Sequence, residues 1–152
     1  RTLASSGEYE IGNVFVTGIM TYRDRKKGAE RGQNIVYSIN IDGTVICHLG
    51  EMASAPTQTQ LEAMGAVNVL LLPVGISGGL TPSMASEVVS LVEPNIVVPM
   101  HYKTPGLQIK RSPVDRFLKE MGVGKLTPEA SLKVSSSDIP EETQIVLLEA
   151  QS

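Results

Sequence analysis

The chain has few of the residues that mark secreted or membrane-spanning proteins. It contains 152 residues with one cysteine, no tryptophan and an aromatic share of 4%. A single cysteine, Cys47, cannot form an internal disulfide, which is typical of proteins in a reducing compartment. The longest apolar run, 67–74, is interrupted by Asn68 and Pro73 and falls short of the ~20 residues that a membrane-spanning helix needs. The sequence therefore predicts a cytoplasmic protein with no membrane segment.

A strong excess of charge of one sign is also lacking. The formal net charge is −3 and the isoelectric point is near 5.4, which argues against general binding to nucleic acids or anionic membranes. Hydrophobic residues make up 41% of the chain and charged residues 19%, as in ordinary soluble domains. We expect one domain over residues 1–152. Because the chain begins at Arg1, we also expect it to be the interior part of a longer protein.

The first third of the chain has the pattern of antiparallel strands. Runs of β-branched and aromatic residues predict four strands, over residues 8–11, 14–22, 35–41 and 44–47. The Asp42–Gly43 pair between the last two runs is among the strongest short-range signals for a β-hairpin. A loop rich in charged residues, 23–33, separates the two pairs of strands. This loop is either a solvated connection or a lid or phosphate contact over the ends of the strands.

Helices and strands alternate in the rest of the chain. Thr57 and Gln60 have the spacing of a capping box, and Gly65 follows the predicted helix 58–64. The remaining predicted elements are a strand over 69–74, a helix from Pro82 to about Val92, a strand over 96–100, a helix from Pro113 to Met121, and a closing pair of strands over 131–134 and 144–148. Strands followed by alternating helices and strands predict a mixed sheet with helices packed on it.

Polar side chains that can bind metals follow two of the predicted strands. The chain has only two histidines, His48 and His101, and Glu51 comes shortly after the first of them. The carboxyl ends of strands in an open α/β sheet face the crevice where ligands bind. We therefore expect Glu51, His101 and Arg23 to converge on one crevice. Structural alternatives stay open, because Glu51 could cap a turn and His101 could be a packed histidine.

Six segments carry a family resemblance: 7–11, 21–22, 28–32, 47–50, 71–75 and 99–105. In this order and at these intervals they resemble bacterial Zn-dependent hydrolases of the metallo-β-lactamase fold. The resemblance implies an α/β fold, namely an αββα sandwich whose N-terminal part is absent from this chain. It also implies a binuclear metal site between two sheets, where a metal-bound hydroxide attacks an ester, amide or phosphodiester bond. Zinc is the implied cofactor of the full-length protein, with manganese or iron as alternatives.

The chain departs from the family pattern at most of the ligand positions. The first ligand block of the family, His-x-His-x-Asp-His, does not occur in this sequence. Arg23 stands where the family usually has a ligating histidine, and Glu51 stands where it has a bridging aspartate. An arginine cannot ligate a metal because its guanidinium stays protonated. His101 alone matches its ligand position, so the comparison predicts a degraded or single-metal site.

These considerations assign roles to seven residues. We expect Glu51 and His101 to be the catalytic residues and metal ligands, with Asp24 as a further ligand only if the strand end is rotated or bulged. Four residues are expected to support the site or to bind an anion, and these are Arg23, His48, Tyr102 and Lys103. Because high-affinity zinc sites need three or four protein ligands, we expect no tight metal binding by this chain alone.

Two functions stay open at this point. The first is a metal-dependent hydrolase acting on an unknown small-molecule or phosphodiester substrate. The second is a non-catalytic member in which Arg23 replaces the charge of the metal and binds an anion or stabilises an assembly. The apolar strand segments 14–16 and 35–37 are expected to lie on an uncovered face and to associate with a second copy of the chain. The sequence therefore also predicts a homo-oligomer.

Overall fold

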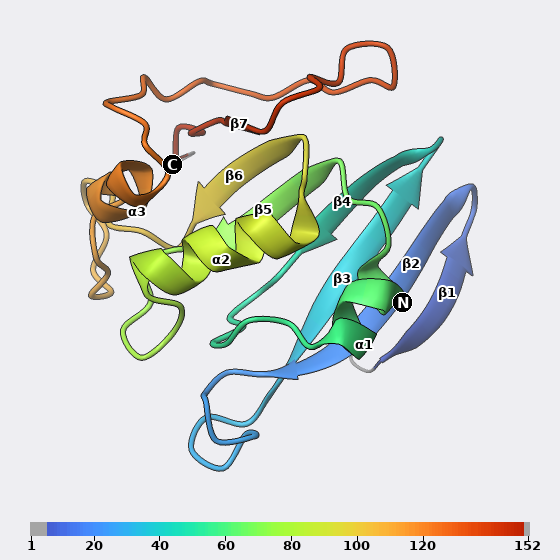
Figure 1. The fold of residues 1–152 in the computed structure, drawn as a ribbon, viewed down its shortest axis with the longest axis horizontal. Coiled ribbons are helices and arrows are strands. Elements are labelled where there is room, and N and C mark those ends of the chain that lie inside the picture. Colours follow the sequence, from blue (N-terminus) through green and yellow to red (C-terminus); the bar gives the residue numbers. More distant parts are fainter. Residues whose placement is uncertain (1–5, 151–152) are drawn as a thin grey trace.

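A computed structural model describes residues 6–150, which fold around one seven-stranded sheet (Figure 1). The strands are adjacent in chain order and are β1 (Gly7–Ile11), β2 (Val14–Tyr22), β3 (Gln33–Ile41), β4 (Thr44–His48), β5 (Val69–Pro73), β6 (Ile96–Met100) and β7 (Gln144–Ile145). Neighbouring strands are antiparallel from β1 to β4 and parallel from β4 to β7. The predicted mixed sheet is confirmed.

A tight turn fixes the register of β3 and β4. Asp42 and Gly43 both have positive φ, at 51° and 85°, and Asn40 Oδ1 accepts a hydrogen bond from the Gly43 N–H at 3.0 Å. Positive φ at both central residues is what the type I′ hairpin turn requires. The register that results places His48 opposite Tyr37, with both side chains on the sheet face that the helices do not cover. The hairpin predicted from Asp42–Gly43 is confirmed.

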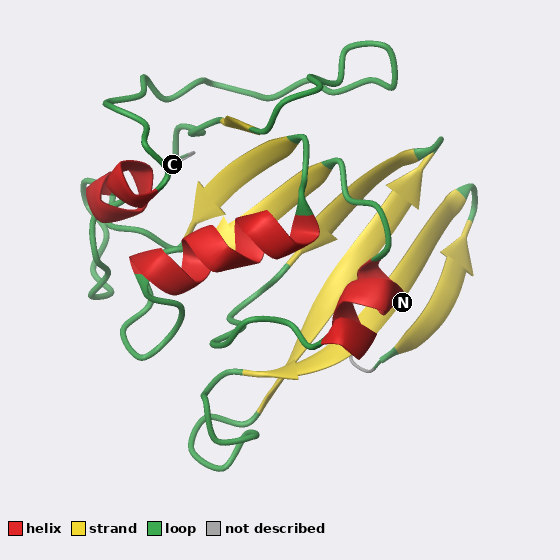
Figure 2. Cartoon of the chain, in the orientation of Figure 1, coloured by secondary structure: helices red, strands yellow, loops and turns green. Residues whose placement is uncertain are grey.

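Three helices complete the regular structure of residues 6–150, and α1 and α2 lie across one face of the sheet (Figure 2). Their bounds are α1 (Gln58–Met64), α2 (Pro82–Val92) and α3 (Asp115–Glu120). At the start of α1, Gln60 donates its N–H to Thr57 Oγ1 and accepts the Thr57 N–H on its side chain, at 3.2 and 2.9 Å. This is the predicted capping box. None of the helices within residues 6–150 is long and apolar enough to cross a membrane.

The main core lies between the helices and the sheet. Leu70, Leu72 and Val97 point from the central strands toward Val88 of α2 and Phe117 of α3, and all five are fully buried. On the other face, the C-terminal segment covers β5 and β6 by packing its apolar side chains against Val69, Ile96 and Val98. The face of β2, β3 and β4 remains open. Residues 6–150 thus form one helical layer and one sheet, which are two of the four layers of an αββα sandwich.

Two elements differ from the prediction. Helix α3 begins at Asp115 and has no side-chain cap, because Ser112 instead forms backbone hydrogen bonds with Gly75 and Lys103. The predicted pair of closing strands is wrong, since 131–134 is not a strand. Within 144–148, Gln144–Ile145 forms a short strand parallel to β6 and Leu148 forms an isolated bridge with Glu129. The apolar residues of these segments pack against the face of β5 and β6. Side-chain packing, rather than strand pairing, accounts for their alternation.

Candidate metal and anion site

A groove of about 870 Å³ lies on the open face of the sheet. Its apolar floor is formed by side chains of β2 and β3, namely Val16, Ile35, Tyr37 and Ile39. Its polar lining comes from residues at or just beyond strand ends, namely Arg23, Asn34, His48, Glu51 and His101. The structure therefore brings Arg23, Glu51 and His101 to one crevice. The crevice lies where β2, β4 and β6 run out into loops.

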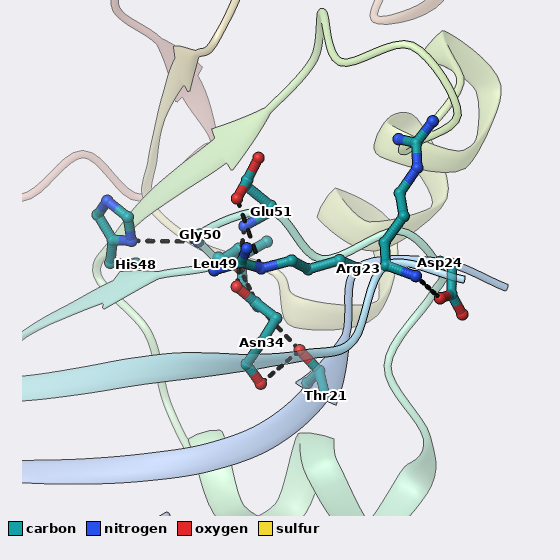
Figure 3. A network of polar contacts seen from close by, with 9 residues as sticks. Thr21, Arg23, Asp24, Asn34, His48, Leu49, Gly50 and Glu51 are labelled. Carbon is teal, nitrogen blue, oxygen red and sulfur yellow. Dashed lines mark hydrogen bonds and ion pairs between the residues drawn. The ribbon is translucent and has the colours of Figure 1, made fainter. Parts of the chain in front are cut away.

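An ion pair joins two of these side chains. Arg23 Nε lies 3.5 Å from Glu51 Oε2, and the two side chains face each other (Figure 3). They are 48% and 39% exposed, so the pair is largely solvated. Such pairs contribute roughly 0–1 kcal/mol to stability. The guanidinium nevertheless places a fixed positive charge beside the carboxylate that the sequence predicts to be a metal ligand.

Asn34 positions the backbone of Glu51. Its side chain, in a residue that is 6% exposed, donates from Nδ2 to the Leu49 carbonyl at 2.8 Å and to Thr21 Oγ1 at 2.9 Å. Its Oδ1 accepts the Glu51 N–H at 3.0 Å (Figure 3). Gly50 has a φ of 63°, and a Cβ there would lie 2.5 Å from Asn34 Oδ1. One amide thus connects β2, β3 and the loop that carries Glu51.

Sequence reasoning did not identify Asn34. The residue stood just outside the strand predicted over 35–41, where an asparagine is unremarkable. Asparagine is uncommon inside a strand, so a predicted strand that included Asn34 would have marked it as unusual. In the structure Asn34 is buried within β3, which begins two residues before the predicted strand.

His48 faces the groove from β4, and its ring is oriented by the chain that follows it. Nδ1 accepts the Gly50 N–H at 3.1 Å (Figure 3). The proton of the neutral ring is therefore on Nε2. Burial lowers the pKa of His48, and a hydrogen bond to its own backbone acts in the opposite direction. His48 is thus a neutral side chain whose Nδ1 lone pair is occupied.

His101 directly follows β6 and has a left-handed backbone, with a φ of 56°. Gly75 packs against it so closely that a Cβ at Gly75 would collide with the His101 carbonyl oxygen. Burial lowers the pKa of His101 most, Arg111 and His48 lower it further, and Glu51 acts in the opposite direction. The imidazole is therefore neutral at pH 7, and one ring nitrogen has a lone pair that can accept a proton or a metal.

Asp24 does not line this groove. It lies beyond Arg23, apart from Glu51 (Figure 3), and is 5% exposed. Its two carboxylate oxygens accept four backbone N–H groups at 2.7–2.9 Å, from residues 26, 28, 30 and 31. The hydrogen bond from Arg31 is the largest cause that lowers its pKa to about 2; burial opposes the shift and the other three bonds add to it. With both oxygens engaged in this way, we leave Asp24 out of the ligand set.

The loop closed by Asp24 is also tied to the rest of the molecule. Arg25 Nη2 donates to the Gly79 carbonyl and Arg31 Nη1 to the Ser77 carbonyl, both at 2.6 Å. The loop is therefore anchored to the segment before α2. These contacts favour the interpretation of this loop as a connection between strands over that of a movable lid.

The other candidate side chains lie away from the groove. Tyr102 donates its hydroxyl to the Leu148 carbonyl at 3.4 Å, and burial raises its pKa. Lys103 is exposed, and its N–H bonds to the Ser112 carbonyl. Cys47 is fully buried on the helix side of β4, where burial raises the pKa of its thiol to about 12.

The side chains at the groove do not fit a zinc ion by themselves. Within residues 6–150, no group of three His, Cys, Asp or Glu side chains could hold a metal ion. Glu51 and His101 are two candidate ligands, whereas zinc sites take three or four protein ligands. Arg23 also lies beside Glu51, where its charge opposes that of a bound cation.

Comparisons with known proteins give the family. The model of the beta-lactamase superfamily domain matches residues 1–101. A UPF0173 metal-dependent hydrolase from Thermococcus kodakarensis is 31% identical over 100 residues, which are 64% of this chain and 45% of that protein. A UPF0173 protein from Pyrococcus abyssi is 36% identical over 106 residues, which are 70% of this chain and 47% of that protein. The chain thus spans about half the length of the curated relatives that it matches.

Solved structures agree. A protein from Thermotoga maritima, described as a Zn-dependent hydrolase of the metallo-beta-lactamase superfamily, has a TM-score of 0.79 and 32% identity, covering 99% of this chain and 73% of its own. A metallo-beta-lactamase fold protein from Bacillus subtilis shares the fold, with a TM-score of 0.60 and 8% identity over 99% of this chain and 53% of its own. The relatives are mostly archaeal, so they do not show a bacterial origin. The chain belongs to the metallo-β-lactamase superfamily.

Proposed function

We propose that this chain is part of a metal-dependent hydrolase and that Glu51 and His101 are the metal ligands that it supplies. The observation that carries the proposal is their meeting in one groove of the superfamily fold. A carboxylate and a neutral imidazole are a donor set that zinc accepts, with manganese and iron as alternatives. Metals in such hydrolases activate water for attack on the substrate. The groove volume of about 870 Å³ is that of a small-molecule site.

The site proposed here is degraded or limited to one metal. Arg23 and a divalent cation beside Glu51 would repel each other, and the longer side chain of glutamate holds a bridging position less firmly than aspartate. A third or fourth ligand would have to come from outside the described part of the chain.

The ion pair of Arg23 and Glu51 also favours a second candidate function. The Arg23 side chain is half exposed in a groove, and within residues 6–150 its ion-pair partner is the solvated carboxylate of Glu51. A phosphate or carboxylate ligand could replace that partner at little cost. In this alternative the protein binds an anion and does not catalyse hydrolysis.

Calorimetric titration with Zn²⁺ and with inorganic phosphate separates the two candidates. We expect Arg23→His to bind one Zn²⁺ at least about tenfold more tightly than the wild type, because it removes the competing charge and adds an imidazole. His101→Ala should cancel this gain. Arg116→His, which adds a histidine at an exposed position of α3, is the matched control and should bind zinc like the wild type.

The anion-binding alternative predicts a different pattern. Wild-type protein would bind phosphate, Arg23→Gln would lose that binding, and Arg23→His would gain no zinc affinity. If Arg23→His and Arg116→His bind zinc equally, the assignment of Glu51 and His101 as ligands is wrong. A gain in zinc binding should be followed by assays with p-nitrophenyl acetate and bis-p-nitrophenyl phosphate, which report ester and phosphodiester hydrolysis.

A further inference from the structure

The loop that follows His101 forms a second groove, of about 380 Å³. His101 lines this groove as well as the first, so the two grooves adjoin at this residue. The walls of the second groove are mostly apolar and include Val98, Met100, Leu107, Ile109 and Leu148. Its volume is at the lower end of the range for small-molecule sites, which excludes a large ligand.

Two apolar side chains of this groove are unusually exposed. Leu107 is 43% exposed and Ile109 is 60% exposed. The base of their loop is closed by backbone hydrogen bonds of Ser112 with Lys103 and with Gly75, both at 2.9 Å. The loop tip is therefore held beside the end of β6. Neighbouring apolar side chains that line a groove, rather than being scattered singly, indicate an apolar ligand.

The groove also contains one cation without a carboxylate partner. Arg111 is partly buried, and in the part of the chain that the structure describes it forms no ion pair. Its Nη1 donates a hydrogen bond to the carbonyl of its neighbour Lys110, at 3.1 Å. A guanidinium in apolar surroundings binds carboxylates and phosphates strongly. The combination of an apolar wall and a single cation is complementary to an amphiphilic anion.

We propose that this second groove binds a medium-chain carboxylate, with its anionic group on Arg111 beside His101 and its chain along Leu107 and Ile109. The proposal also names esters of such acids as the substrate class of the hydrolase. This second part rests on the proposed function. Hydrolysis of the ester breaks the bond between acyl carbon and alkoxy oxygen. The hydroxyl of water goes to the acyl carbon and its proton to the alcohol. The carboxylic acid that forms releases its own proton to solvent, so the carboxylate is the product retained in the groove.

Calorimetry with butanoate, octanoate and octanol tests the site without any metal or turnover. Each methylene that is buried strengthens binding about fourfold, so octanoate should bind at least tenfold more tightly than butanoate. Octanol should bind at least tenfold more weakly than octanoate in the wild type. In Arg111→Gln this advantage of octanoate should disappear.

Further variants locate the chain of the ligand. The double variant Leu107→Asn with Ile109→Asn should abolish the preference for octanoate over butanoate. Leu91→Asn is the matched control, because Leu91 on α2 is also 43% exposed and lies in neither groove. It should bind octanoate like the wild type.

Other outcomes would overturn the proposal. Equal binding of octanol and octanoate would show that the groove selects no anion. A loss with Arg23→Gln but none with Arg111→Gln would place the anion in the first groove. Equal weakening in Leu91→Asn would show nonspecific apolar binding. Zinc titration and octanoate titration are independent. Octanoate binding therefore tests the second groove even if Glu51 and His101 prove not to be metal ligands.

Discussion

The amide of Asn34 should contribute more to stability than any other single polar side chain at the groove. Asn34→Ala removes three hydrogen bonds, to the Leu49 carbonyl, the Glu51 N–H and Thr21 Oγ1, at 2.8, 3.0 and 2.9 Å. Leu49 is fully buried, so its carbonyl loses a partner that solvent does not readily replace. A buried polar group left without a partner costs roughly 1–3 kcal/mol. We therefore expect the free energy of unfolding to fall by about 3 kcal/mol.

Urea unfolding followed by circular dichroism measures this loss, with the variant Asn40→Ala as the control. Asn40 lies on the same strand, and its side chain makes one exposed hydrogen bond, to the Gly43 N–H. Its replacement should cost about 0.5–1 kcal/mol. If the two variants differ by less than about 1 kcal/mol at unchanged denaturant dependence, the Asn34 network does not hold the Glu51 loop in place, and the reasoning fails.

Three further predictions concern Gly50, Asp24 and Cys47, the first two tested by unfolding and the third by alkylation. Gly50→Ala should lower the free energy of unfolding by at least about 1 kcal/mol more than Gly43→Ala, because both glycines have positive φ but only Gly50 would meet Asn34; equal losses would contradict the close approach. Asp24→Asn should lower the urea midpoint at pH 7. The pKa of the Asp24 carboxyl is lowered from 3.8 to about 2, so the carboxylate stabilises the fold only when ionised, and the difference between variant and wild type should shrink as the pH falls from about 4 to 2. A difference that does not depend on pH would refute this. Iodoacetamide at pH 8 should leave Cys47 unmodified in the native protein and alkylate it in urea. A pKa of about 12 reduces the fraction of thiolate roughly a thousandfold. Rapid labelling of the native protein would show that the thiol is accessible.

The parts of the fold that the sequence predicted well depend on local interactions. The hairpin at Asp42–Gly43 and the capping box of Thr57 and Gln60 each involve residues no more than three positions apart. The start of α3 was missed because a tertiary contact competes there. Ser112, which precedes a proline and has the pattern of a helix cap, uses its backbone to join Gly75 to the loop after β6.

The candidate site was only partly predictable for the same reason. Polar residues after strands located Glu51 and His101, since strand ends meet at one edge of a sheet. The environment of each side chain depends on longer-range contacts. Asp24 was considered as a ligand, but four backbone N–H groups of its own loop engage it. Asn34 has its partners 13 to 17 residues away along the chain, and no local pattern indicates them.

The contrast between Asn34 and Arg23 separates stability from specificity at the groove. Asn34 is buried and holds backbone groups, so its loss should cost about 3 kcal/mol. The ion pair of Arg23 with Glu51 is solvated and contributes at most about 1 kcal/mol. Arg23 can therefore be replaced without unfolding the chain, although it decides whether a cation or an anion is favoured beside Glu51. One substitution can change the chemistry of the groove, because the scaffold that positions Glu51 does not depend on Arg23.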